Sequence, residues 1–179
     1  KDEADVLIAG LEERQRQIRE QMSPWEKLDI DWEDFHPRAR EILPDHRLWD
    51  GVDDFSPNGN DTGADVLQLV QEHMPAVSDS GDEGKGFYEQ IWKGWGFSFP
   101  PDRKPSDGIE YTTHREFIVG LAFAYLKVLG HCPAWLRDMA EEEIATYKKY
   151  LERSHKDWTH FSEAIEMQDL MRSVLSNSN

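Results

Sequence analysis

The chain has almost no cysteine, and it has no apolar run long enough to cross a membrane. Cys132 is the only cysteine among 179 residues, so no disulfide can form within the chain. This fits a reducing compartment, and we expect a cytoplasmic protein. Cys132 itself is expected to be a small buried residue rather than a nucleophile. The longest apolar run, residues 117–129, is broken by Lys127 and is shorter than the ~20 residues of a membrane span.

Recognisable catalytic motifs are also absent. The sequence contains neither the G-x-S-x-G pattern of a nucleophile elbow nor the G-x-x-x-x-G-K-[ST] pattern of a phosphate-binding loop. A sequence pI near 4.7 argues against direct binding to DNA, RNA or anionic lipid, because all three carry negative charge. The sequence therefore names no chemistry, and these ligand classes are not expected.

Negative charge is abundant, and most of it lies in one window. The formal net charge is −16, and residues 31–82 contribute −10, with thirteen Asp and Glu against three Arg. Charge gathered in this way sets up a directional field that attracts a positively charged partner. The chain is not a disordered acidic tail, because 38% of its residues are hydrophobic and seven are Trp.

Apolar residues recur at helical spacing along most of the chain. We expect an all-α protein, mainly helical with at most one short strand pair, in a single domain of about six helices over residues 1–179. Residues 24–60 are expected to form an irregular acidic segment and residues 94–111 a long loop. The helices are expected at residues 3–22, 62–74, after a capping box at 80–83, at 117–129 after a second capping box at 113–116, at 133–153 and at 157–175.

The leading hypothesis for function is a non-enzymatic acidic protein that docks on a basic protein surface and neutralises or sequesters it. Inhibitors, immunity proteins and DNA mimics use this principle, in which carboxylates take the place of phosphates. The partner would be a toxin, a nuclease or a DNA-binding protein, with no direct contact to nucleic acid or membrane and no cofactor. Trp49 is expected to anchor the contact, although it would serve equally to pin the acidic segment to the helices. The predicted partner-binding residues are Asp31, Glu33, Asp34, Asp45, Trp49, Asp50, Asp53, Asp54 and Asp61.

The main alternative is an enzyme whose site assembles from residues far apart in the sequence. A deep pocket with converging histidine and carboxylate groups would favour this enzyme, whereas a convex acidic face would favour the binding protein. The candidate components of such a site are Glu110, His114, His131, Cys132 and His160.

Two patterns have the spacing of metal ligands. From Asp54 to Asp65, oxygen-bearing side chains fall at positions 1, 3, 5, 9 and 12 with Gly at position 6, as in a calcium-binding EF-hand loop. A calcium-binding module that uses residues 54–65 is therefore the third alternative for function. A turn at Asn58 followed by a helix cap explains the same residues. Glu33 with His36, and Asp157 with His160, each place a carboxylate and an imidazole three residues apart, as in di-iron bundles. Surface histidines explain this second pattern, and no metal ligand is assigned.

Overall fold

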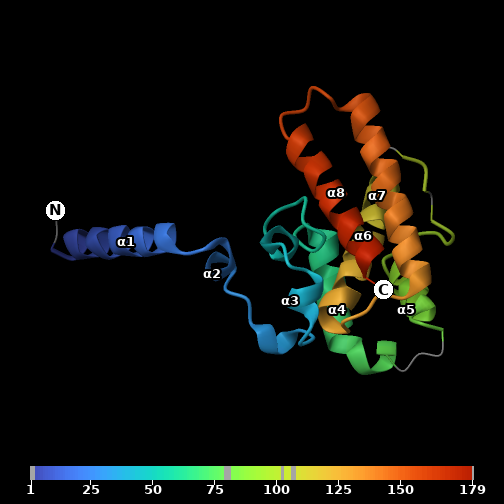
Figure 1. Cartoon of the computed structure of the whole chain (residues 1–179), viewed down its shortest axis with the longest axis horizontal. Coiled ribbons are helices and arrows are strands. Elements are labelled where there is room, and N and C mark those ends of the chain that lie inside the picture. The colour runs from blue at the N-terminus through green and yellow to red at the C-terminus, as the bar shows by residue number, and fades with distance from the viewer. Residues whose placement is uncertain (1–2, 79–81, 102, 106–107, 179) are drawn as a thin grey trace. The chain divides into compact units, whose positions relative to one another are not determined.

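The computed structural model describes residues 3–78, 82–101, 103–105 and 108–178. The chain divides into two compact units, Lys1–Asp31 and Trp32–Asn179. Within the described residues there are eight α-helices and no strand (Figure 1). The predicted all-α class is therefore confirmed, and the strand pair has no counterpart in this part of the chain.

The first unit consists of α1 (Glu3–Gln21) and the short helix α2 (Pro24–Leu28). The break between them falls at residues 22–23, close to the predicted end of the first helix at residue 22. Ser23 Oγ accepts from the Glu26 amide at 3.2 Å, and the Glu26 carboxylate accepts from the Ser23 amide at 2.7 Å, which is a complete capping box. The apolar stripe of α1 remains solvent-exposed, with side chains that are more than half exposed at Val6, Leu7, Ile8, Leu11 and Ile18.

The second unit is built around α6 (Ile109–Val128), which is buried on nearly every side. Fourteen of its residues are buried, as the sequence predicts for a helix that is apolar all round. It packs against α4 (Asp61–Ser78) and α7 (Ala134–Ser154), and α7 packs against α8 (Phe161–Asn177), as Figure 1 shows. The remaining elements are 3-10 helices η1 (Trp32–Asp34) and η2 (His46–Trp49) and α-helices α3 (Ala39–Ile42) and α5 (Lys85–Gly94).

Some helix boundaries differ from those predicted. The helix expected to begin after a capping box at Thr113 begins at Ile109, so Thr113 lies inside it. The reason is burial, since Tyr111 and His114 in the first turns pack into the core. The helix expected to end at Pro75 continues to Ser78.

Two further boundaries concern the starts of α5 and α8. Ser80, in the other predicted capping box, lies outside the described residues, and α5 begins at Lys85 after Gly84, whose φ is 81°. Helix α8 begins at Phe161 rather than 157.

A close contact between two helix backbones joins α4 to α6. A Cβ atom on Gly120 would lie 2.9 Å from Gly63 Cα, and a Cβ on Gly63 would lie 2.3 Å from the Pro57 carbonyl oxygen. The buried Asn58 side chain bridges the two helices, because its Nδ2 donates to the Gly63 and Gly120 carbonyls, both at 3.0 Å. Residues 57–63 therefore fix the start of α4 on the middle of α6.

Replacing Gly63 by Ala is expected to lower the free energy of unfolding by about 1–3 kcal/mol, because the added methyl group meets backbone atoms that cannot move independently. Urea unfolding followed by circular dichroism measures the change. Gly94→Ala is the matched control, since a Cβ at Gly94 has nothing within 4 Å. Equal stability of the two variants would contradict the close packing.

Candidate functional site

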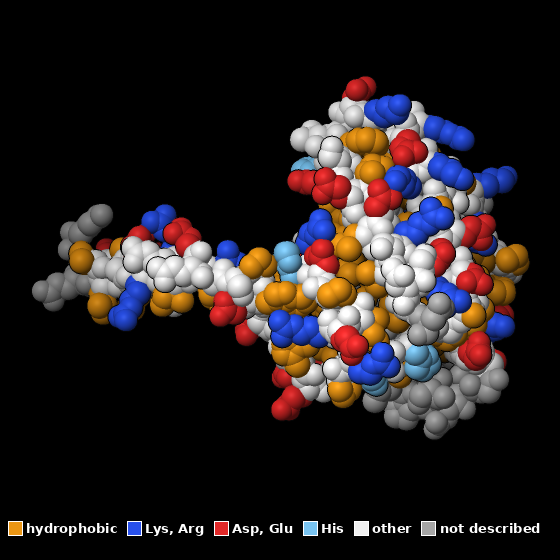
Figure 2. Space-filling model, in the orientation of Figure 1, with side chains coloured by type: hydrophobic (Ala, Val, Ile, Leu, Met, Phe, Trp, Pro, Cys, Tyr) orange, Lys and Arg blue, Asp and Glu red, His pale blue; other side chains and the backbone are white. Residues whose placement is uncertain are grey.

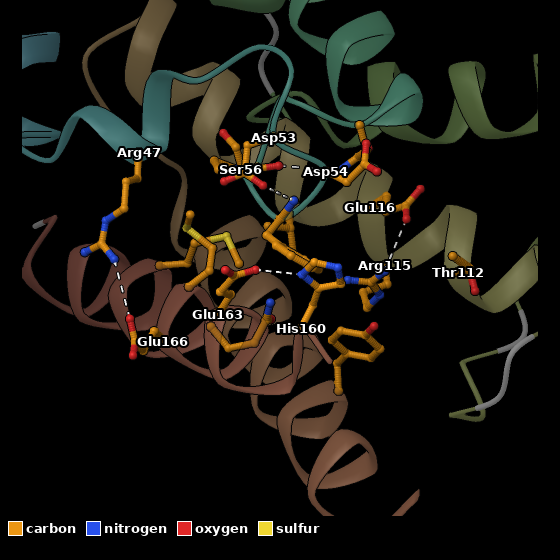
Figure 3. Close-up of a pocket in the computed structure, with 18 of the residues that line it drawn as sticks. Arg47, Asp53, Asp54, Ser56, Thr112, Arg115, Glu116, His160, Glu163 and Glu166 are labelled. Carbon is orange, nitrogen blue, oxygen red and sulfur yellow. Dashed lines mark hydrogen bonds and ion pairs between the residues drawn. The ribbon is translucent and has the colours of Figure 1, made fainter. Parts of the chain in front are cut away.

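A cleft of about 850 Å³ opens on the second unit, within the size range of ligand-binding sites (Figure 3). One wall is the loop of residues 52–60 that precedes α4. The other sides come from α6, from Tyr147 on α7, from the connection between α7 and α8, and from α8. Segments more than 100 residues apart in the sequence thus meet at one site.

The local structure of these segments determines which of their side chains line the cleft. Thr112, Arg115, Glu116 and Val119 have the spacing of a single face of α6. The wall formed by residues 52–60 contains a tight turn. The Asp53 carboxylate accepts a hydrogen bond from the Phe55 amide at 3.0 Å, and the Asp53 carbonyl accepts one from the Ser56 amide at 2.8 Å.

The cleft carries more negative than positive charge. Its five carboxylates outnumber two guanidinium groups, and both guanidinium groups are already engaged. Arg115 lies 3.2 Å from Glu116, while Arg47 lies 2.8 Å from Asp45 outside the cleft and 3.9 Å from Glu166. The carboxylates without an ion pair to a described Lys or Arg are those of Asp53, Asp54 and Glu163.

Aromatic rings lie beside these carboxylates. The Phe55 ring meets the Trp158 ring edge to face at 5.6 Å, and the His160 ring lies 5.8 Å from Trp158. Trp158 is 38% exposed, so part of its ring is available to a ligand in the cleft. On the other side of the cleft, the Arg115 guanidinium stacks 3.8 Å from the centroid of Tyr147.

The cleft also contains one histidine–carboxylate pair. His160 Nδ1 lies 2.8 Å from the Glu163 carboxylate, one turn along α8 (Figure 3). Two polar atoms near this pair have no hydrogen-bond partner among the described residues: Ser56 Oγ, in a residue that is 1% exposed, and the buried Arg115 Nε. Buried polar atoms are rarely left in this state.

Most of the predicted partner-binding residues lie outside the cleft. Asp53 and Asp54 line it, whereas Asp45 is held by Arg47, whose hydrogen bonds lower the pKa of that carboxyl. Asp31 belongs to the first unit. Side chains that are exposed or half-buried, and that do not line the cleft, are those of Glu33, Asp34, Asp50 and Asp61.

The expectation that Trp49 is a surface anchor is wrong. Trp49 is 7% exposed, and its Nε1 donates to the Leu43 carbonyl at 2.9 Å. Its ring packs edge to face on Phe35 at 5.1 Å and on Trp32 at 4.9 Å. Trp49 therefore pins the irregular segment to the helices, the alternative role that the sequence allowed.

Acidic and basic side chains are mixed on the molecular face seen in Figure 2. A single uniform acidic field is not visible there. The excess of negative charge in the cleft comes from Asp53, Asp54 and Glu163, which form no ion pair with a described Lys or Arg, although Glu163 lies 2.8 Å from His160.

The residues considered for a scattered catalytic site do not converge. Only His160 lines the cleft. His131 is exposed, and Cys132 is buried as predicted, where burial raises the pKa of its thiol to about 12. Glu110 is half-buried at the start of α6 and does not line the cleft.

His114 belongs to a separate buried network. Tyr88 Oη lies 3.0 Å from His114 Nε2, and the Glu143 carboxylate lies 3.7 Å from His114 Nδ1. Arg103 donates to Glu143 at 2.6 Å. Burial is the main cause that lowers the pKa of His114 to about 4, and burial also raises the pKa of Glu143. His114 is fully buried, so this network has the form of internal support for the loop that carries Arg103.

The metal patterns are used differently in the structure. In the segment with calcium-loop spacing, Asn58 turns into the core, and Asn60 Oδ1 caps α4 by accepting from the Gly63 amide at 2.8 Å. His36 Nδ1 lies 3.2 Å from the Arg38 amide, and His160 pairs with Glu163 rather than with Asp157. Among the described residues, no group of three or more His, Cys, Asp or Glu side chains has the geometry of a metal site.

Among the cleft residues on α6, on α8 and directly before α8, only His160 was assigned to a candidate site from the sequence. Their signal was present as spacing, because His160, Glu163 and Glu166 follow one another at intervals of three, which places them along one side of a predicted helix. Nothing in the sequence indicates that this side faces residues 52–60.

Comparison with models of protein families, with curated proteins and with solved structures found no match for this chain. Within the described residues, none of the helices combines the length and the apolar character that crossing a membrane requires.

Proposed function

We propose that this protein is a non-enzymatic binding protein whose acidic cleft holds a basic segment of a protein partner and so neutralises or sequesters it. The observation that carries the proposal is the set of three carboxylates, Asp53, Asp54 and Glu163, which line one cleft without an ion pair to any Lys or Arg that the structure describes. Carboxylates in a hollow attract cations more strongly than the same charges on a convex surface.

The neighbouring side chains support a protein partner over a free ion. The partly exposed Trp158, with Phe55 packed against it, supplies the aromatic component that is common at the centres of protein interfaces. An aromatic face beside carboxylates also suits the side chains of Arg and Lys, which combine an apolar stem with a charge.

Neutralising the cleft is expected to slow association with a basic protein roughly tenfold at low salt and to flatten the dependence of the rate on salt. The variant is Asp53→Asn, Asp54→Asn and Glu163→Gln, in which the Asn at position 53 keeps the oxygen that accepts from the Phe55 amide. Stopped-flow association with fluorescently labelled lysozyme and cytochrome c, two folded basic proteins, provides the rates.

The matched control removes the same charge elsewhere. Asp65→Asn, Glu72→Gln and Glu152→Gln change three exposed carboxylates that do not line the cleft. Equal rates for the two triple variants would mean that net charge alone drives association, and the proposal would fail.

An enzyme is the second candidate, favoured by the pairing of His160 with Glu163 inside a cleft. This is the convergence of histidine and carboxylate that the sequence analysis gave as the mark of an enzyme. Ser56 lines the cleft and carries a hydroxyl group, which acts as a nucleophile only when a neighbouring base accepts its proton. Its Oγ makes no hydrogen bond to a base among the described residues. Turnover of p-nitrophenyl esters by the wild type that disappears in His160→Gln would favour the enzyme.

A further inference from the structure

We propose that the segment held by the cleft is an extended basic peptide, recognised through its main-chain carbonyl groups as well as through its cationic side chains. This inference rests on the proposed function and specifies the form of the partner. It starts from the two polar atoms of the cleft wall that no described residue satisfies, Ser56 Oγ and Arg115 Nε.

Arg115 Nε is a donor and requires an acceptor. The side chains of Lys and Arg have only donors, so the cationic groups of a partner cannot satisfy it. The main chain of a peptide carries one carbonyl acceptor per residue, and an extended segment leaves these carbonyls unbonded. A basic peptide therefore supplies both the cation that the carboxylates attract and the acceptor that Arg115 lacks.

Ser56 Oγ can accept as well as donate. It belongs to the same wall as Asp53 and Asp54, in a residue that is 1% exposed. A guanidinium that reaches Asp54 has further N–H groups available for this oxygen, because its five donors lie in a fixed planar fork. Both unsatisfied atoms are covered in the structure, so contact with them requires the surrounding side chains of the cleft to shift.

The depth of the site agrees with a chain segment rather than a flat surface. The cleft is bounded by the loop of residues 52–60, by α6, α7 and α8 and by the connection between α7 and α8, and its volume of about 850 Å³ is at the upper end of the range for bound small ligands. We place the cationic side chain beside Asp54 and Glu163 with its stem on Trp158, and the main chain toward Arg115.

Fluorescence anisotropy tests this with a labelled, end-capped hexapeptide of alternating Arg and Gly. Ser56→Ala and Arg115→Lys are expected to weaken peptide binding about tenfold each, the usual effect of losing a hydrogen bond to a charged group. Arg115→Lys keeps the positive charge but replaces the guanidinium, so it removes the Nε donor together with the contacts to Tyr147 and Glu116. Ser56→Ala removes an atom that accepts from and donates to none of the described residues, so the melting temperature of this variant is expected to be at or above that of the wild type.

Spermine and a folded protein serve as the comparison ligands. Spermine carries cations without any acceptor, so it is expected to bind more weakly than the peptide and to be insensitive to Arg115→Lys. Equal affinity for spermine, or peptide binding that is unaffected by both substitutions, overturns the inference. If lysozyme binds through the cleft and the peptide does not, the inference fails while the proposed function stands. If lysozyme and the peptide bind the wild type no more tightly than they bind the cleft-neutralised triple variant, both the inference and the proposed function fail.

Discussion

Replacing Lys127 by Met is expected to stabilise the protein at pH 7 and to remove most of the rise in its stability between pH 7 and 8.5. Lys127 is 2% exposed in the middle of α6, and burial lowers the pKa of its ammonium group to about 7. In the unfolded chain this group keeps its proton up to about pH 10. The native state therefore binds fewer protons between pH 7 and 10, and stability rises with pH in this window.

The size of the effect follows from this pKa and from one contact. The shift corresponds to about 4 kcal/mol of lost stability at pH 7, of which about 1.5 kcal/mol returns by pH 8.5. Lys127 Nζ lies 5.0 Å from the centroid of the Trp49 ring, a contact that offsets about 2 kcal/mol when the amine is charged and desolvated. Met fills a similar volume without a charge, so we expect a net gain of about 1–3 kcal/mol at pH 7.

Urea unfolding at pH 7.0 and 8.5 measures both effects. Burial raises the pKa of the Cys132 thiol to about 12. Above about pH 9 this thiol ionises in the unfolded chain but not in the native protein, which lowers stability. The pH range of the experiment therefore ends at 8.5. Lys149→Met, at an exposed position of α7, is the control and is expected to leave the pH dependence unchanged. A Lys127→Met protein that is no more stable than the wild type, or that keeps the same pH dependence, would contradict the assigned cost of the buried amine.

Periodicity predicted the helices well because their apolar faces are continuous in sequence. The run 117–129 is apolar on every side, and it became the buried central helix. Periodicity does not reveal that the side chain of Glu143 is buried against Arg103, forty residues away in sequence. A local pattern carries no information about such a partner, so charged residues were placed less reliably than apolar ones.

The sequence predicted only the part of the candidate site that residues 52–60 contribute. The acidic window identified Asp53 and Asp54, because charge density can be counted along the sequence. It also included Trp49, which the structure buries, since an aromatic residue in a charged segment has the same sequence signature whether it is exposed or packed inward. The residues that α8 contributes to the cleft were not predicted, because the sequence does not show that α8 packs opposite residues 52–60.

Acid is expected to destabilise the protein by about 2.5 kcal/mol between pH 7.5 and 4.5, and His114→Gln is expected to lose most of this dependence. The pKa of His114 is lowered to about 4, first by burial and then by the positive charge of Arg103, whereas the unfolded value is near 6.5. The native state therefore binds fewer protons in this window. The contribution of neutral His114 is complete above pH 6.5 and is lost as the pH falls toward 4.

The neighbours of His114 determine how the experiment is read. The Tyr88 hydroxyl is hydrogen-bonded to His114 Nε2, and the amide of Gln at position 114 offers both an acceptor oxygen and a donor N–H for this bond. Glu143 acts in the opposite direction, because burial raises the pKa of its carboxyl group. The native state therefore takes up this proton before the unfolded chain does, which reduces the loss of stability in acid. Urea unfolding at pH 7.5, 6.0 and 4.5 of the wild type, of His114→Gln and of the exposed control His131→Gln distinguishes the contribution of His114 from that of Glu143. An identical pH dependence in the wild type and in His114→Gln would show that the buried imidazole is not the group that acid titrates.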